Sequence, residues 1–222
     1  SQRLSQGIST IMFSATLLPV NYFKEMLSGN ADDYAVYAHS PFDTDNKRVL
    51  IGRDVTSRYT RRNYNEYTKI AGYIHTLTQS KQGKYMIFFP SYSYMREVYD
   101  IYIQNVIDLH DVEDGSYIYH LSEGENVLIQ DNNMTEADKE NFLSVFMDNT
   151  SGNVTGFCVL GGIFSEGIDL RDKSLIGACI VGTGIPMICR QRNILRNYFD
   201  SIGKNGYQYA YVFPGMNKVL QA

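Results

Sequence analysis

The fold of this chain is decided by residues 159–170, which read VLGGIFSEGIDL. With Phe157 and Cys158 before it, the stretch opens as a short apolar run that predicts a buried strand. Two glycines then end the strand, since glycine lets the backbone take positive φ or approach a ligand closely. The loop that follows offers Ser165, Glu166, Gly167 and Asp169. Ligands of open α/β sheets bind outside the carboxyl ends of the strands, so this loop predicts one wall of a site. The alternative is a tight turn whose Glu166 and Asp169 are simply solvated.

Length and composition indicate an ordinary globular protein. The chain has 222 residues, of which 44% are hydrophobic and 20% charged, and its net charge is −4. This charge excludes a general polyanion binder, so any contact with nucleic acid must come from a local basic patch.

The cysteines and the hydropathy bear on the compartment. Cys158, Cys179 and Cys189 are odd in number, lie among apolar residues and form no CxxC motif. They indicate buried thiols in a reducing, cytoplasmic setting rather than disulfides or a zinc or iron–sulfur site. No apolar run is long enough to cross a membrane and no signal peptide opens the chain, so we expect no membrane partner.

Strand-like and helix-like segments alternate along the chain, which predicts an α/β fold with a mostly parallel sheet. The predicted strands are 8–13, 34–39, 47–55, 84–89, 117–121, 127–130, 157–160, 175–182 and 207–213. Helices are expected after Pro19, over 67–77, from Ser91 to Val106, after Thr135, after Pro186 and after Met216. A domain boundary is expected near residues 16–20.

Two further segments have side chains suited to phosphate. Ser91 and Ser93 begin a helix directly after a strand, and a helix N-terminus with hydroxyls can bind phosphate or simply be capped. The segment 53–62 holds Arg53, Arg58, Arg61 and Arg62 around Tyr59. Arginines mixed with aromatics can bind phosphates and stack bases. An exposed loop leading into a helix is the alternative. Arg190, Arg192 and Arg196 are expected on a solvated helix face.

Four blocks stand in a particular order: FSATL at 13–17, FFPSY at 88–92, GGIFSEGIDL at 161–170 and NKVLQA at 217–222. Together they resemble motifs III, IV, V and the start of VI in the second motor domain of superfamily 2 DNA helicases of the XPD/DinG type. The resemblance implies a RecA-like three-layer α/β/α domain over residues 19–222, cut at the start of motif VI before its last helix and strand. Residues 1–18 would be the end of the first motor domain and a linker.

In such motors ATP binds between two RecA-like domains and single-stranded DNA crosses them, so the resemblance implies a role for each block. Ser14, Ala15 and Thr16 would couple the two sites. Ser91 and Tyr92 would face the DNA backbone, and Ser165 and Glu166 would lie near DNA or the domain interface. Gly167, Asp169 and Gln221 would lie near the nucleotide, with Asp169 a candidate for the ribose.

The catalytic parts of such a motor are missing from this sequence. It contains no G-x-x-x-x-G-K-[ST], since Gly83-Lys84 is followed by Tyr85 and Gly203-Lys204 by Asn205, and it contains no Asp-Glu-x-His block. ATP and Mg²⁺ would both need the first motor domain, and an iron–sulfur cluster could occur only there. We therefore expect no metal site and no complete catalytic set here, and a chain that is inactive alone.

Within the parent protein, the resemblance implies DNA-stimulated ATP hydrolysis in a monomer, with the N-terminal motor domain and single-stranded DNA as partners. The runner-up is a non-catalytic nucleic-acid-binding RecA-like regulatory module. A small-molecule enzyme on a doubly wound sheet has little support, because no nucleophile–base pair or metal set emerges from the four histidines, His39, His75, His110 and His120.

Overall fold

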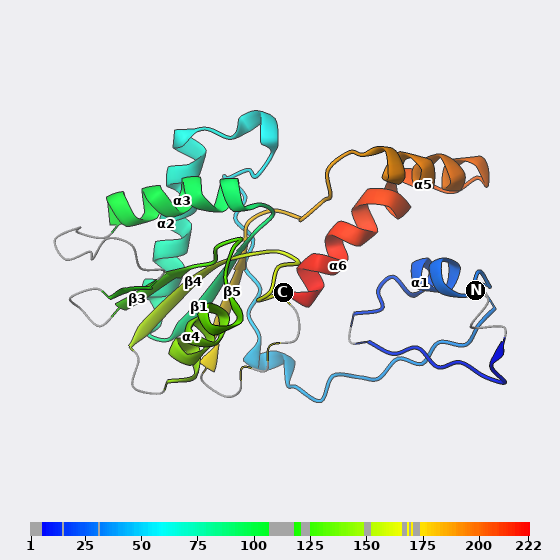
Figure 1. The fold of residues 1–222 in the computed structure, drawn as a ribbon, viewed down its shortest axis with the longest axis horizontal. Coiled ribbons are helices and arrows are strands. Elements are labelled where there is room, and N and C mark those ends of the chain that lie inside the picture. The colour runs from blue at the N-terminus through cyan, green and yellow to red at the C-terminus, as the bar shows by residue number, and fades with distance from the viewer. Residues whose placement is uncertain are drawn as a thin grey trace. The chain divides into compact units, whose positions relative to one another are not determined.

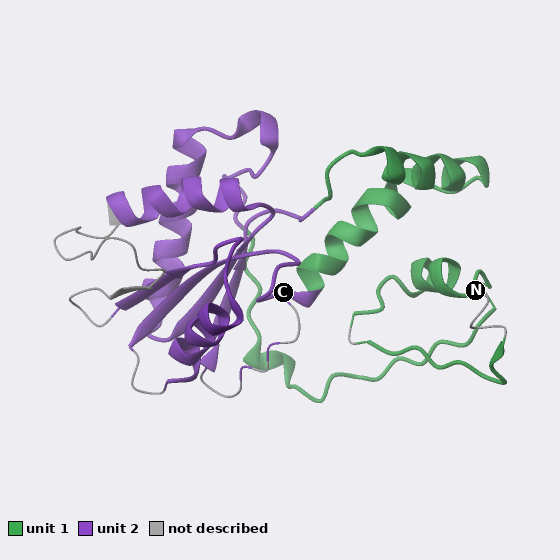
Figure 2. Cartoon of the chain, viewed as in Figure 1, with its two compact units in different colours: residues 1–51, 185–220 green, residues 52–184, 221–222 purple. Residues whose placement is uncertain are grey.

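The computed structural model describes residues 6–14, 16–30, 32–106, 118–120, 125–148, 152–165, 168, 170 and 174–222. The chain separates into two compact units, one of residues 1–51 with 185–220 and one of residues 52–184 with 221–222 (Figure 2). This separation does not test the division expected after residue 18, which stays a prediction.

The larger unit holds a five-stranded sheet in the order β2-β3-β4-β1-β5 (Figure 1). Its strands are β1 (Lys84–Phe89), β2 (Ile118–His120), β3 (Glu125–Ile129), β4 (Asn153–Val159) and β5 (Gly177–Ile180). The pairs β3–β4, β4–β1 and β1–β5 are parallel, while β2 runs antiparallel to β3. All six residues of β1 are buried. A continuous apolar run is typical of a central strand covered on both faces.

Helices cover both faces of this sheet. Successive side chains of a strand point to opposite faces, so β4 shows which helix lies where. Phe157 belongs to the core cluster that also holds Ile74 of α2 (Tyr64–Ser80) and Met95 of α3 (Tyr92–Val106). A Cβ on the preceding residue, Gly156, would instead meet two phenylalanine rings of α4 (Glu136–Met147). The predicted α/β/α layering with a mostly parallel sheet is therefore confirmed.

Helix α4 is fixed at both ends by polar groups. Thr135 Oγ1 accepts from the Asp138 N–H at 3.2 Å and the Thr135 N–H donates to Asp138 Oδ2 at 2.8 Å, which together form a capping box. At the other end, Lys84 Nζ donates to the carbonyls of Phe146 and Asp148 at 2.7 and 2.6 Å. Lys84 is only 5% exposed, so these two acceptors are what make its burial tolerable.

The smaller unit is helical, with α1 (Val20–Leu27), α5 (Arg190–Ser201), a π-helical turn (Gln208–Val212) and α6 (Phe213–Gln221). An aromatic cluster holds it together: Tyr22 of α1 contacts the rings of Tyr209 and Phe213 at 5.7 and 5.3 Å, and Phe199 stacks on Tyr209 at 4.0 Å. These rings join a segment near the start of the chain to the helices near its end.

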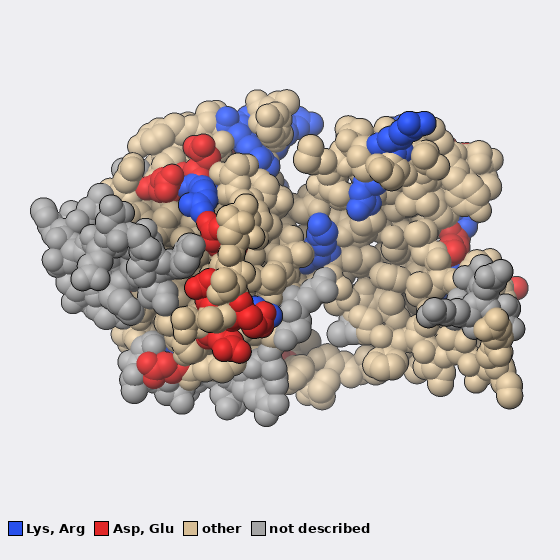
Figure 3. Space-filling view, in the orientation of Figure 1, with Lys and Arg blue, Asp and Glu red and all other residues tan. Residues whose placement is uncertain are grey.

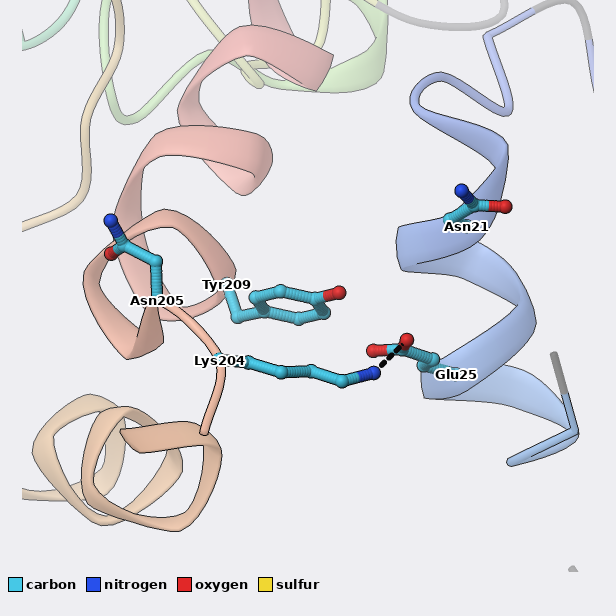
Figure 4. Close-up of a pocket in the computed structure, with 5 residues that line it drawn as sticks. All are labelled: Asn21, Glu25, Lys204, Asn205 and Tyr209. Carbon is cyan, nitrogen blue, oxygen red and sulfur yellow. Dashed lines mark hydrogen bonds and ion pairs between the residues drawn. The ribbon is translucent and has the colours of Figure 1, made fainter. Parts of the chain in front are cut away.

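Beside the aromatic cluster lies a cleft of about 540 Å³, lined by Asn21, Glu25, Lys204, Asn205 and Tyr209 (Figure 4). The Lys204 ammonium pairs with the Glu25 carboxylate and holds the pKa of that carboxyl below its usual value. Burial, with Glu25 next to it, raises the pKa of Tyr209 to about 12. Lys204 neutralises the charge of Glu25 through Oε1, while Oε2 is buried without a hydrogen-bond partner in the described part of the chain.

Three predicted strands are wrong. Residues 8–13, 34–39 and 47–55 contain no strand, and a short 3₁₀ helix (Thr44–Asn46), capped by Asp43, separates the last two segments. Tyr34 and Val36 are fully exposed despite their apolar character. Residues with high strand propensity do not form a strand unless a second strand pairs with them through backbone hydrogen bonds, and none does so in the described residues.

The predicted strand over 207–213 is also wrong, because the chain there is helical and continues through Pro214. Proline has no N–H to donate to the carbonyl four residues earlier, which belongs to the buried Ala210. Arg192 Nη1 donates to that carbonyl at 2.7 Å instead. A side chain from α5 thus replaces the missing helical hydrogen bond.

Helix α5 begins at Arg190 rather than at Pro186, and its buried residue is Phe199. Met187, Ile194 and Tyr198 are exposed despite their apolar character.

The packing of α4 on β4 gives a matched pair of glycine tests. A Cβ at Gly156 would lie 2.8 Å from a Phe146 ring atom and 3.0 Å from Phe142, so Gly156→Ala should lower the free energy of unfolding by roughly 1–3 kcal/mol. Gly72 lies within α2 with no atom within 4 Å of its added Cβ, so Gly72→Ala should raise stability by roughly 0.5–1 kcal/mol. Urea unfolding checks both, and a neutral Gly156→Ala would contradict the packing described.

Candidate functional site

A buried amide ties together the carboxyl ends of two strands and the start of a helix. Gln130 follows β3, is 0% exposed, and its backbone N–H continues the ladder to Phe157 O at 2.8 Å. Its Oε1 accepts from the Val159 N–H at the end of β4, and its Nε2 donates to the Tyr92 hydroxyl at the start of α3, both at 2.9 Å. This edge of the sheet is therefore joined by one polar network, in which the bond to Val159 is buried and the bond to Tyr92 is partly buried.

The glycine loop after β4 is folded against the same network. Gly161 has φ 69°, a region that glycine enters readily. A Cβ on Gly162 would lie 2.9 Å from both Val159 O and Gln130 Nε2. Ser165 is buried, and its hydroxyl donates to Val159 O and accepts from the Gly161 N–H, both at 2.9 Å. Both glycines are thus required by geometry, and Ser165 closes the loop onto the strand that precedes it.

The start of α3 lies beside this loop through Tyr92. Ser91 caps the helix, since its Oγ accepts from the Tyr94 N–H at 3.4 Å, as the sequence predicts. Burial raises the pKa of Tyr92, so its hydroxyl stays protonated at neutral pH. Because it accepts from Gln130, its own proton is left to donate to a further acceptor. Ser91 and Tyr92 are both half-buried and within reach of a ligand.

The arginine-rich segment before α2 reaches the same edge of the sheet. Gly182, just beyond β5, has φ 95°, and a Cβ there would lie 2.9 Å from Ser57 Oγ and 3.8 Å from Pro90. Ser57 therefore packs where β1 and β5 end. The Arg62 guanidinium lies over the ring of Tyr94, 3.8 Å from its centroid.

The predicted site residues divide into three groups. Ser91, Tyr92 and Ser165 come together around Gln130 at the carboxyl edge. Ser14 and Thr16 belong to the smaller unit, where their hydroxyl oxygens lie 3.3 Å apart, and Gln221 is the last residue of α6. Ala15, Glu166, Gly167 and Asp169 lie outside the described residues.

Sequence reasoning missed Gln130 and Glu66. The buried Glu66 accepts from the Thr56 N–H at 3.0 Å and lies 3.6 Å from Arg61 and 3.5 Å from Lys69. The signal for Gln130 was a lone polar residue at the end of the apolar run Val127-Leu128-Ile129. Where its amide would bond could not be read from the sequence, since its partners lie 29 and 38 residues away.

Within the described ranges, no group of three or more His, Cys, Asp or Glu side chains is arranged to hold a metal ion. Among the same residues, none of the helices combines the length and the apolar character needed to span a membrane.

Comparison with known proteins gives consistent matches. Residues 74–222 match the helicase C-terminal domain family. A solved structure titled XPD helicase is 19% identical, with a TM-score of 0.53, and the match covers 76% of this chain and 26% of that chain. A second, titled XPD apo, is 20% identical with a TM-score of 0.55, and 76% and 30% of the two chains are covered. At these identities the likeness establishes the fold, which is the RecA-like α/β/α arrangement that the sequence predicts.

The Gln130 network predicts a stability cost that depends on which bond is lost. Gln130→Met would leave the Val159 N–H buried without its acceptor, so we expect a loss of roughly 2–3 kcal/mol in the free energy of unfolding. Tyr92→Phe removes the acceptor of Gln130 Nε2, but this bond is only partly buried, so the variant should cost roughly 1 kcal/mol. Urea titrations of the two variants measure the difference, and equal stability of Gln130→Met and the parent chain would refute the network.

Proposed function

The chain belongs to the helicase C-terminal domain family, and from that premise we propose that it is the second motor domain of an ATP-dependent DNA helicase. The observation that carries this proposal is the convergence of the α3 start and the glycine loop on Gln130 at the carboxyl edge of the sheet. Since the chain spans 26% and 30% of the two solved chains it matches, the activity is proposed for a larger parent protein.

Single-stranded DNA is the proposed ligand of the α3 side. The Ser91 hydroxyl, the Tyr92 proton and the N-terminus of a 15-residue helix are suited to phosphate oxygens. Contacts of this kind position a strand without reading its sequence. Because the Ser165 hydroxyl is engaged within its own loop, we assign Ser165 to shaping the loop, with Glu166 beside it toward DNA or the domain interface.

ATP and Mg²⁺ are the proposed ligands of the nucleotide side, bound together with the first motor domain. Of the residues assigned to the nucleotide side, Gln221 lies among the described residues. Gly167 and Asp169 lie outside them and follow residues 161–165 in the sequence. Mg²⁺-bound ATP would supply the phosphoanhydride bond whose cleavage drives movement, and the phosphate-loop lysine and metal carboxylates would come from the other domain.

The loop also explains how the two ligands would affect each other. Residues 161–165 are held by the Ser165 bonds to the Gly161 N–H and Val159 O, and Gly162 lies close against Gln130, so a shift at one end of the loop would be passed along it. Coupling between sites is a free energy that both ligands share. Ser14, Ala15 and Thr16 would pass this coupling on to the first motor domain.

The DNA assignment is tested by removing both hydroxyls while keeping the helix start. Ser91→Gly with Tyr92→Phe should weaken binding of single-stranded DNA by roughly tenfold, because glycine is a tolerated cap and each hydroxyl supplies a phosphate contact. Fluorescence anisotropy with oligonucleotides of different sequence measures this, and the loss should be similar for all. Ser144→Ala on α4, at the other face, is the control. A loss confined to one base composition, or none, would contradict the assignment.

The chain alone should neither hydrolyse ATP nor unwind DNA, because the parts that carry most of the rate of phosphoryl transfer are not in its sequence. A steady-state phosphate-release assay with saturating single-stranded DNA checks this. Turnover above the no-protein background would show that the chain carries a catalytic set that its sequence does not reveal.

A further inference from the structure

The segment 53–62 is a local basic patch on an acidic protein. Residues 53–69, which run from this segment into α2, hold five positive side chains and two negative ones, a surplus of three, while the whole chain has a net charge of −4. The positive ones are Arg53, Arg58, Arg61, Arg62 and Lys69, and the negative ones are Asp54 and Glu66. Figure 3 shows basic side chains grouped over the region where this segment leads into α2. The positive surplus is thus concentrated, as a polyanion contact requires.

This patch is built on fixed supports and is not a loose loop. Glu66 Oε2 accepts from the Thr56 N–H at 3.0 Å, and the same carboxylate lies 3.6 Å from Arg61 Nη2. On the other side, Ser57 packs on Gly182 so closely that a Cβ there would meet its Oγ at 2.9 Å. The segment is therefore held at the carboxyl edge of the sheet, next to the strand ends and the start of α3.

Within the segment, Arg62 is oriented in advance. Its guanidinium lies over the ring of Tyr94 with the central carbon 3.8 Å from the ring centroid, and its Nε donates to Ser57 O at 3.3 Å. Its two terminal nitrogens have no acceptor within the described part of the chain, and neither has the exposed guanidinium of Arg58. An arginine whose guanidinium group is held in place while its two terminal nitrogens are free is well suited to bidentate contact with phosphate oxygens.

Tyr59 supplies the second element of the patch. Its side chain is 81% exposed, and its ring centroid lies 5.5 Å from the Arg62 guanidinium. An aromatic ring left in water beside free phosphate donors is suited to stack an unpaired base, which is sequence-tolerant because every base has a π-face. A duplex offers no such base, so this arrangement favours a single strand.

We propose that Arg58 and Arg62 bind backbone phosphates of a single strand of nucleic acid while Tyr59 stacks on one of its bases. The inference rests on the proposed function and extends it, because it places a second contact region at the carboxyl edge of the sheet, where Ser57 and Pro90 lie near Gly182. The strand would be held at two places, by phosphate contacts at the start of α3 and by phosphate and base contacts before α2.

Two variants of the 222-residue chain separate the two kinds of contact. Arg58→Gln should weaken binding of a fluorescent oligothymidylate by roughly fivefold and reduce the slope of log K against log salt by about 0.7, because one phosphate contact is lost. Tyr59→Leu should weaken oligothymidylate binding by roughly tenfold but leave an abasic strand of equal length bound as by the wild type. Lys139→Gln on α4 removes the same charge from the opposite face and should change neither quantity.

The outcomes distinguish this inference from the proposed function. If Arg58→Gln and Tyr59→Leu both bind as the wild type while Ser91→Gly with Tyr92→Phe binds weakly, the second contact region is refuted and the helicase assignment stands. If Tyr59→Leu loses as much affinity for the abasic strand, the base-stacking role is refuted. If the wild-type chain binds neither strand at low salt, the proposed DNA binding fails and this inference fails with it.

Discussion

The buried amide of Gln130 is the constraint on which the rest of the candidate site depends. An uncharged polar group in a core is tolerated only when its hydrogen bonds are made, and this one meets a strand end, a helix start and a glycine loop with two atoms. If the strand end or the helix start moved, a hydrogen bond of the buried amide would be lost, and the loop packs too closely on it at Gly162 to move independently. The carboxyl edge therefore behaves as one rigid body, which is what a surface needs in order to transmit a change between two ligands.

The face of the sheet that α4 covers depends on a different constraint, which is the close approach of the helix to β4. Gly156 lets the rings of Phe142 and Phe146 lie directly on β4, and Lys84 receives the last carbonyls of α4. This face contributes stability and no candidate ligand group. The candidate ligand groups lie at the carboxyl edge instead, which is where ligands of open α/β sheets generally bind.

The sequence predicts this fold well where the signal is local. Tyr85–Phe89 is an unbroken apolar run, and the Thr135 capping box has both partners within four residues. Prediction from the sequence fails where the structure of a segment depends on residues far away in the chain. Residues 34–39 have strand composition but no neighbouring strand in the described residues, and the helix through Pro214 depends on Arg192 from another element. The motif at 88–92 identifies Ser91 and Tyr92 as candidate site residues. No motif identifies Gln130, because its hydrogen-bond partners are distant in the chain.

The pairing of β1 also bears on how the chain is made. Lys84 pairs with Val154, and Tyr85 pairs with Gly177, so the central strand is synthesised before either of its neighbours. Contacts of such sequence separation slow folding, because the chain must close long loops first. On the ribosome, β1 emerges with both of its edges unpaired. They remain unpaired until β4 and then β5 have left the exit tunnel. An apolar strand that is interior in the finished sheet is thus unpaired on both edges for part of translation, and a chaperone that binds extended apolar segments would have a target there.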